Sequence, residues 1–351
     1  MTIGVLYDFD QGDGGAYFES GLRLGLERAG LEKAGVGHVA RESELVARHA
    51  DGLPGGSAEA VADAFAELVD AGVVAIVGPS ITDNGLVVRD LCDDAGLACV
   101  NYTGGAITRS RWMFHYQVGS LEEEPHVLAD HLGSRGLRRV SVLHDDTPVG
   151  TNYQLWFERA VTRSPVRIVH AAAVSPLAED LSDEVGTALA AQPDALVYLG
   201  LGVAARAVAL ALAAAGWSGP VVANSALMFG YGRREWRAGW DGWAYLDTVS
   251  DANAERVALR ETSPALAGGP IGVAAYDIGR LLGTALLLAD RVDGAEPTRD
   301  ALREGLERVK RMPAASGRPG TVMGFGQWDH AALKGDALVL RSWRDGRTVE
   351  L

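Results

Sequence analysis

The chain has 351 residues, of which 48% are hydrophobic and 22% are charged, a composition typical of a folded globular protein. Its formal net charge of −14 would repel a phosphate backbone, and no basic cluster with interleaved aromatic residues offsets this charge. Nucleic acid is therefore disfavoured as a partner, and the length is sufficient for two cores of ordinary size.

The first 118 residues predict one α/β lobe. Apolar strands are expected at 2–8, 36–40, 73–77, 97–101 and 112–117. Helices are expected between the earlier strands, and Gly72, Gly78 and Gly96 mark the turns. An acidic, glycine-rich loop at 10–15 precedes the helix expected at 17–29.

The alternation of strands and helices then restarts in a second lobe. Its strands are expected at 138–144, 166–174, 194–200, 219–223 and 242–247. Residues 272–311 predict two helices without strands of their own, so the chain is expected to cross back to the first lobe. The expected division is 1–118 plus 250–325 for lobe one and 119–249 plus 326–351 for lobe two, with the several crossings forming a hinge.

One pattern recurs in both halves: an apolar strand, a polar loop rich in Gly, Ser and Thr, and a helix. Such loops are found at 78–80, 147–151 and 200–202. In a parallel sheet they lie at the carboxyl ends of the strands, where helix N-termini point N–H groups at a crevice. Two such lobes predict a cleft that closes on a small molecule.

The order of these elements, with the segments 78–80, 101–105 and 324–336, resembles the type I periplasmic binding proteins of the branched-chain amino acid and amide-binding branch. The resemblance implies an α/β fold of two Rossmann-like lobes with parallel central sheets, joined by a multi-crossing hinge. It also implies non-enzymatic binding of a small organic solute in the interlobe cleft, without a cofactor. Exported members of this family deliver solutes to the permease of an ABC transporter.

The resemblance implies ligand contacts after the third strand of lobe one. Ser80 matches the Ser or Thr of the family, and Thr82 follows closely. Their hydroxyls and the nearby N–H groups would bind a carboxylate or amide oxygen of the ligand. The alternative role of Ser80 is to cap the helix expected at 84–95.

Two further segments of lobe one complete its expected half of the site. Tyr102, Thr103 and Gly104 form the loop after the fourth strand, and packing at the strand end is the alternative role of Tyr102. Tyr17 and Phe18 begin a helix after the glycine-rich loop. One of these two rings is expected to face the cleft.

In lobe two, Val149 and Gly150 match a position where the family often carries a Tyr before a Gly, so an aromatic lid is missing. Ser225 falls where amino acid binders carry the carboxylate that pairs with the ligand ammonium group. An uncharged Ser would leave that buried ammonium unpaired, which costs several kcal/mol. An amide, an aromatic acid or another weakly charged compound is therefore expected rather than a standard zwitterionic amino acid.

Aromatic residues gather near the end of lobe two. Phe229 and Tyr245 are expected to contact the ligand, because aromatic walls suit an apolar or planar solute. The alternative is a core beneath the loop, which would include Tyr231, Trp236, Trp240 and Trp243.

No metal site or redox pair is expected. His126 and His131 are five residues apart, a spacing that does not place both squarely on one helix face. The run Glu122–Glu124 is interpreted as an acidic helix start rather than an acid pair. Cys92 and Cys99 occupy apolar positions and are expected to be buried thiols, with a disulfide or redox pair as the alternative.

Two other functions remain open from the sequence. The first is a cytoplasmic, amide-sensor-like regulator that binds a regulatory protein or forms a homodimer. The second, a hydrolase, is disfavoured because Ser80 is not followed two residues later by the Gly of a nucleophile elbow.

No secretion signal precedes the first strand, so the chain is expected to be cytoplasmic if complete as given. It would instead be periplasmic or an extracytoplasmic lipoprotein if a signal peptide was removed. The apolar stretches 204–215 and 278–288 are expected to be too short or too interrupted to span a bilayer.

Overall fold

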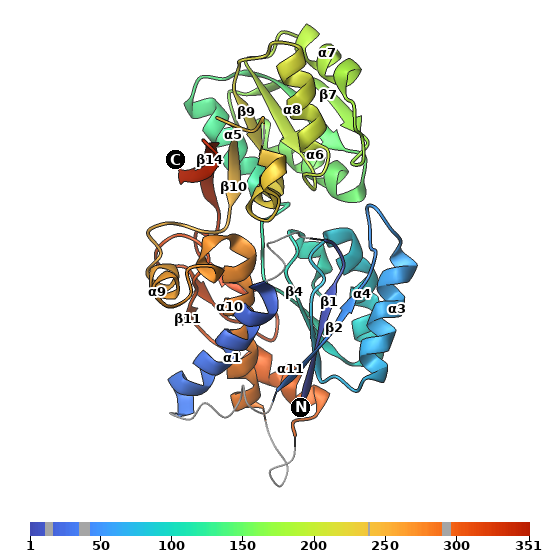
Figure 1. Cartoon of the computed structure of the whole chain (residues 1–351), viewed down its shortest axis with the longest axis vertical. Coiled ribbons are helices and arrows are strands. Elements are labelled where there is room, and N and C mark those ends of the chain that lie inside the picture. Colours follow the sequence, from blue (N-terminus) through green and yellow to red (C-terminus); the bar gives the residue numbers. More distant parts are fainter. Residues whose placement is uncertain (11–16, 35–42, 238, 290–295) are drawn as a thin grey trace. The chain divides into compact units, whose positions relative to one another are not determined.

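The computed structural model describes residues 1–10, 17–34, 43–237, 239–289 and 296–351. These residues form two compact units (Figure 1). Unit 1 comprises Met1–Val118 and Thr248–Ala337, and unit 2 comprises Gly119–Asp247 and Leu338–Leu351. The chain therefore passes between the units three times.

A small antiparallel sheet extends the C-terminal part of unit 1. Its order is β11-β12-β13, with β11 at Met312–Pro313, β12 at Val322–Met323 and β13 at Leu333–Lys334. Because β13 pairs with β12, the chain stays in unit 1 as far as Ala337. The C-terminal part of unit 2 is consequently shorter than the 326–351 of the sequence-based division.

The main sheet of unit 1 has the order β2-β1-β3-β4-β5, and all of its pairs are parallel. Its strands are β1 (Thr2–Tyr7), β2 (Glu44–His49), β3 (Ala75–Val77), β4 (Ala98–Asn101) and β5 (Met113–His115). The strand predicted at 36–40 and most of the acidic loop at 10–15 lie outside the described residues. The strand that follows β1 among the described residues is β2, which the hydrophobic pattern did not indicate.

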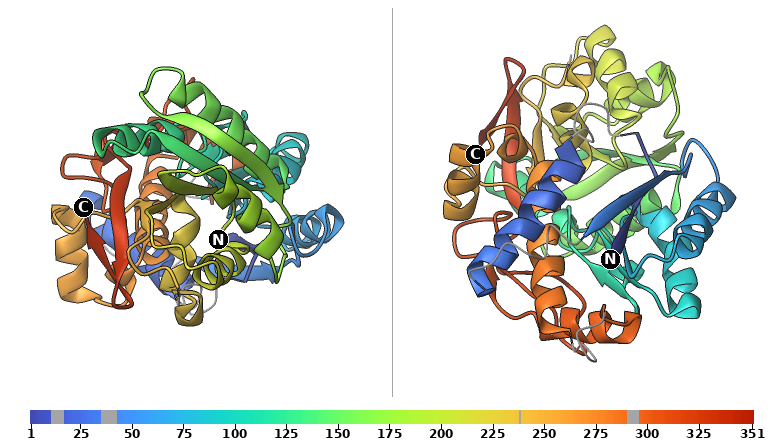
Figure 2. Two further views of the ribbon diagram at one scale, coloured as in Figure 1. Left: turned by 90° about the horizontal axis from the view of Figure 1, so that it is seen from above. Right: turned by 60° about the horizontal axis from the view of Figure 1, so that its bottom comes forward.

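The helices of unit 1 are α1 (Phe18–Ala34), α3 (Ala58–Asp70), α4 (Thr82–Ala95), α9 (Ala254–Thr262), α10 (Pro270–Leu288) and α11 (Arg299–Arg308). In Figures 1 and 2, α1 and α10 lie side by side on one side of the sheet, and α3 lies on the other. Gly25 of α1 and Gly279 of α10 allow this close packing. A Cβ at Gly25 would collide with the carbonyl oxygen of Tyr276, and one at Gly279 with that of Leu22.

Helix α10 is longer than the apolar stretch seen in the sequence. Among the described residues it is the one helix long and apolar enough to cross a membrane, and 83% of the window that qualifies is buried in the structure. Its Asp277 carboxylate is also buried and accepts hydrogen bonds from the Tyr116 hydroxyl at 2.7 Å and the Ala315 N–H at 2.8 Å. This burial and polar pairing are those of a core helix.

The sheet of unit 2 has the order β15-β14-β10-β9-β8-β6-β7. Strands β6 to β10 pair in parallel, whereas β14 runs antiparallel to β10 and β15 runs antiparallel to β14. The strands are β6 (Arg139–Asp145), β7 (Arg167–Val174), β8 (Ala195–Leu199), β9 (Val221–Ala223), β10 (Ala244–Asp247), β14 (Val339–Arg344) and β15 (Arg347–Glu350).

Two hydrophobic cores flank this sheet because successive strand side chains point to opposite faces. Val142 of β6 belongs to the core that includes residues of α5 and α6, whereas its neighbour Leu143 belongs to the core that includes residues of α7 and α8. The helices are α5 (Glu124–Ser134), α6 (Pro148–Val161), α7 (Ser182–Ala190) and α8 (Ala205–Ala214), with the 3-10 helices η3 (Ser225–Tyr231) and η4 (Arg234–Arg237).

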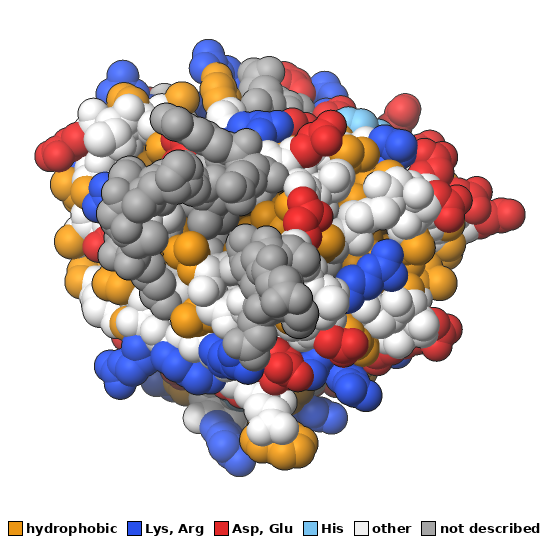
Figure 3. Space-filling view, turned by 90° about the horizontal axis from the view of Figure 1, so that it is seen from below, with side chains coloured by type: hydrophobic (Ala, Val, Ile, Leu, Met, Phe, Trp, Pro, Cys, Tyr) orange, Lys and Arg blue, Asp and Glu red, His pale blue; other side chains and the backbone are white. Residues whose placement is uncertain are grey.

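The predicted α/β class with parallel central sheets is confirmed. In each unit the parallel strands follow one order, in which the second strand is followed by the first, third, fourth and fifth. The thiols of Cys92 and Cys99 are both free and buried, as predicted. On the face drawn in Figure 3, basic and acidic side chains are interspersed.

Candidate functional site

In unit 1 a buried carboxylate joins two of the strand-end loops. Asp8 directly follows β1 and accepts hydrogen bonds from the Ser80 N–H at 2.7 Å and the Ser80 hydroxyl at 2.8 Å. It also accepts from the Ile81 N–H at 2.9 Å and from Nδ2 of Asn84 at 2.8 Å. Two donors therefore reach each carboxylate oxygen, and the start of α4 is held against the end of β1.

The protonation of Asp8 reflects two opposing effects. Burial raises the pKa of Asp8 above its ordinary value, because the charged form loses its hydration. The four donors from Ser80, Ile81 and Asn84 act in the opposite direction, since each stabilises the ionised carboxylate. With donors on both oxygens, the observed geometry fits the ionised form.

An aromatic pair lies beside this loop. Phe18 stacks on Tyr102 with ring centroids 4.8 Å apart, and Tyr7 meets Phe18 edge-on at 5.9 Å. Phe18 and Tyr102 are buried, whereas Tyr17 is 45% exposed. Of the two rings at the start of α1, Tyr17 is therefore the one open to a solute.

The loop after β4 uses its hydroxyl groups internally. Thr103 is fully buried and donates its hydroxyl to Oδ1 of Asn101 at 2.9 Å. Asn101 in turn donates to the carbonyl oxygen of Phe114 at 2.8 Å. Thr82 is also buried, and a Cβ at Gly105 would collide with its methyl group. Thr103 and Thr82 thus serve the packing of the loops.

Unit 2 places a carboxylate in the equivalent position. Asp145 ends β6 and accepts hydrogen bonds from the Tyr198 hydroxyl at 2.6 Å and the Leu201 N–H at 2.7 Å. Gly200 lies so close that a Cβ there would collide with the Asp145 carboxylate. Burial raises the pKa of Asp145 to about 6, although both donors favour its ionised form.

A second buried carboxylate in unit 2 belongs to Glu124, the first residue of α5. Its oxygens accept from the Ser120 N–H at 2.5 Å, the Ser225 N–H at 2.6 Å and the Tyr153 hydroxyl at 3.1 Å. Gly119, at φ +89°, leaves the space that Glu124 and Ser225 fill. Burial raises the pKa of Glu124 to about 7, despite these donors.

This contact corrects one step of the sequence analysis. The sequence predicts only the uncharged Ser225 at the position where amino acid binders carry a carboxylate, but the Ser225 N–H donates to the Glu124 carboxylate. Glu124 does begin a helix, as expected of the Glu122–Glu124 run, yet it is buried rather than a solvated helix start.

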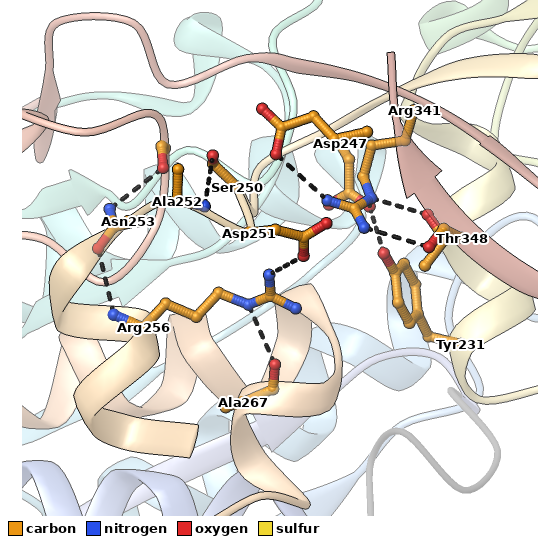
Figure 4. Close-up of polar contacts among 12 residues, drawn as sticks. Tyr231, Asp247, Ser250, Asp251, Ala252, Asn253, Arg256, Ala267, Arg341 and Thr348 are labelled. Carbon is orange, nitrogen blue, oxygen red and sulfur yellow. Dashed lines mark hydrogen bonds and ion pairs between the residues drawn. The ribbon is translucent and has the colours of Figure 1, made fainter. Parts of the chain in front are cut away.

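Most of the aromatic cluster of unit 2 forms part of a core. Tyr245 is fully buried, stacks on Trp343 with centroids 5.7 Å apart, and its hydroxyl contacts Thr348 at 2.8 Å. Figure 4 shows the neighbouring Tyr231, whose hydroxyl donates to Asp247 at 2.7 Å. Tyr245 therefore occupies the position that the core alternative describes.

Comparison with known proteins adds the family. A family model described as periplasmic binding protein matches residues 1–333. The chain belongs to the periplasmic binding protein family. Members of this family bind small-molecule ligands, and its ABC substrate-binding proteins work with transporter permeases. A comparison with curated protein sequences finds no match.

Solved structures share the fold of this periplasmic binding protein over its whole length. A type 1 periplasmic binding protein from Bordetella pertussis has a TM-score of 0.81 at 16% identity, with 100% of this chain and 99% of that one covered. A leucine-binding protein from Thermotoga maritima has 0.77 at 16% identity, with coverage of 100% and 97%. An ABC transporter substrate-binding protein from Desulfitobacterium hafniense, in complex with Leu, has 0.75 at 20% identity, with 100% and 99% covered.

The candidate contact residues of this periplasmic binding protein differ in exposure. Ser80 and Gly104 in unit 1 and Ser225 and Phe229 in unit 2 are partly exposed, and Tyr17 is exposed. Seven others are buried: Phe18, Thr82, Tyr102, Thr103, Val149, Gly150 and Tyr245. The first group is therefore better placed to touch a solute, and the ligand contacts themselves stay predictions.

Sequence reasoning missed Asp8, Glu124 and Asp145. For Asp8 and Asp145 a signal existed, since each is an acidic residue at the end of an apolar strand that opens a lobe. For Glu124 the sequence carries no such signal, because a run of three Glu residues does not show which side chain is buried. Among the described residues, no His, Cys, Asp and Glu side chains form a group of three or more that could hold a metal ion.

Proposed function

We propose that this protein binds a small organic solute without chemical conversion and presents it to an ABC transporter, with each unit supplying half of the site in an interlobe cleft. The family match over residues 1–333 carries the proposal. The proposed binding elements are the strand-end loops that contain Ser80 in unit 1 and Leu201 and Ser225 in unit 2. Their rigid attachment to buried carboxylates supports a preorganised site.

The contacts of Ser80 support binding rather than hydrolysis. A serine nucleophile passes its proton to a base, usually an imidazole that a third group orients. The Ser80 hydroxyl instead donates directly to the Asp8 carboxylate, which four donors hold in place. This arrangement fixes the loop, and within the described ranges the Ser80 hydroxyl has no hydrogen bond to a His that could relay the proton.

The proposed ligand is an amide, an aromatic acid or another weakly charged compound. Phe229, partly exposed on η3, and the exposed Tyr17 offer aromatic surface for such a solute. The presence of Glu124 beside Ser225 weakens the case against an amine-bearing ligand, so leucine, which the Desulfitobacterium protein holds, belongs among the compounds tested.

A thermal-shift screen of the purified protein tests the proposal. The panel contains leucine and other amino acids, aliphatic amides, urea, aromatic carboxylates and small heterocycles. A ligand at about a hundred times its Kd adds about 2.7 kcal/mol of stability, which raises Tm measurably. Recovery of the hit unchanged after long incubation supports binding without turnover. Conversion of the hit into another compound would contradict it.

A further inference from the structure

The hydrogen-bond donors at Ser80 that are predicted to bind the ligand already donate to a carboxylate of this chain. The Ser80 hydroxyl and the N–H groups nearby were expected to meet a carboxylate or amide oxygen of the solute. In the structure, the Ser80 N–H, the Ser80 hydroxyl and the Ile81 N–H all donate to Asp8. A carboxylate of this chain therefore already accepts the hydrogen bonds that the sequence predicts for a ligand carboxylate.

The loops of unit 2 are occupied in the same way. The Leu201 N–H donates to Asp145, and the Ser225 N–H donates to Glu124. Each of these two N–H groups belongs to the second residue after the end of a parallel strand. In three of the proposed binding loops, a backbone N–H thus donates to an internal carboxylate.

Among the described residues, the hydrogen-bond partners of these carboxylates are neutral donors. Within the described part of the chain, no Lys, Arg or His pairs with Asp8, Asp145 or Glu124. A second carboxylate brought to the loop at Ser80 would find the donors of that loop taken and would face the negative charge of Asp8. Repulsion between two partly desolvated carboxylates is strong because the local dielectric is low.

We propose that Asp8 is a specificity-determining residue that excludes carboxylate ligands from the loop at Ser80, so that the solute presents a neutral amide-like group or a cation there. This inference rests on the proposed binding function and narrows its ligand class by removing acids. The Ser80 oxygen keeps acceptor capacity, which suits the N–H group of an amide or an ammonium.

The first test needs no knowledge of the ligand. Asp8→Gly removes the carboxylate and leaves the donors of Ser80, Ile81 and Asn84 around a small void. Sodium formate, compared with sodium chloride at the same ionic strength, should raise the Tm of this variant and leave that of the wild type unchanged. The isosteric Asp8→Asn variant fills the void, so formate should not rescue it.

Failure of formate to rescue Asp8→Gly, or equal stabilisation of the wild type by formate, would overturn the proposal. If Asp8→Gly does not fold in chloride, the same comparison is made by refolding it in formate and in chloride. A folded yield that does not depend on formate would also count against the role of Asp8.

The second test uses pairs of compounds in which one carries a carboxylate and the other carries the corresponding amide. Benzamide and benzoate, and leucinamide and leucine, are titrated into the wild type and Asp8→Asn. In the wild type the amide should bind at least tenfold more tightly than its acid, and Asp8→Asn should reduce that ratio. An acid that binds the wild type as tightly as its amide contradicts the inference. Absence of binding by all four compounds counts against the proposed function, and the role of Asp8 is then decided by the formate experiment.

Discussion

The two units attach a strand-end loop to a buried carboxylate in the same way, but with different donor residues. In each, an acidic residue at the end of the first strand accepts an N–H from the loop that follows the third strand. Asp8 does so for Ser80 and Ile81 in unit 1, and Asp145 does so for Leu201 in unit 2. A shared strand order places these residues in equivalent positions.

The donor sets nevertheless differ. Asp8 receives four hydrogen bonds, two of them from backbone N–H groups at the start of α4, whereas Asp145 receives one from the Tyr198 hydroxyl and one from the Leu201 N–H. Unit 2 adds a further carboxylate, that of Glu124 in α5, which accepts from the Ser225 N–H of the loop after its fourth strand. The shared topology therefore determines where the Asp8 and Asp145 carboxylates lie, and the number of hydrogen-bond donors determines how strongly each carboxylate is bound.

The helix packing of the two units should respond oppositely to the same substitution. Gly279→Ala forces a methyl group into the backbone of α1 and should destabilise unit 1 by about 3 kcal/mol. Gly186→Ala in α7 of unit 2 is the control, since a Cβ there meets no atom within 4 Å, and it should stabilise by about 0.5–1 kcal/mol. Urea unfolding measures both, and destabilisation by Gly186→Ala would contradict the packing described.

The stability of unit 2 should fall as pH rises, because Glu124 has a higher pKa in the folded chain. The pKa of Glu124 is raised from 4.5 to about 7, so its stabilising contribution is complete below about pH 4.5 and is lost as pH rises through 7. The loss is about 3 kcal/mol, at 1.36 kcal/mol per pKa unit. Urea unfolding from pH 4.5 to 8 should show this slope. Because Asp145, with its pKa raised to about 6, adds to the slope below pH 6, Glu124→Gln should flatten the curve mainly between pH 6 and 7. An identical slope in the variant over that range would refute the assignment.

Removal of the Asp8 or the Asp145 carboxylate should lower the free energy of unfolding, and the loss should be larger for Asp8, which has more hydrogen-bond donors. Asp8→Ala leaves four donors without their acceptor and should cost about 2 kcal/mol, whereas Asp145→Ala leaves two and should cost about 1 kcal/mol. Both are compared by urea unfolding at one pH. A larger loss for Asp145→Ala would mean that the number of donors does not determine how firmly each carboxylate is held.

The smallest expected effect is that of the Ser80 hydroxyl on stability. Ser80→Ala removes one of the four hydrogen bonds to Asp8 while the Ser80 N–H remains, so the cost should be about 0.5–1 kcal/mol. Thermal unfolding of the variant beside Asp8→Ala checks this. A loss as large as that of Asp8→Ala would show that Ser80 has a structural role beyond this contact.

The sequence indicated the α/β alternation because apolar strands and amphipathic helices have different local periods. It could not indicate which acceptor meets which donor, since Asp8 and Ser80 are 72 residues apart and Glu124 and Ser225 are 101 apart. The strand β2 was missed because its residues are only partly buried and show no apolar alternation. The burial of Tyr245 could not be predicted, because composition alone does not distinguish a core aromatic residue from an exposed one.

The most direct test of the account is a calorimetric titration of one hit from the screen into the wild type and into one variant from each unit. Ser80→Ala represents unit 1 and Phe229→Ala represents unit 2, and both positions are partly exposed. If each unit supplies half of the site, both variants should stay folded and bind at least tenfold more weakly, which corresponds to about 1.4 kcal/mol. An unchanged Kd in the folded variants of either unit would contradict a site shared by both.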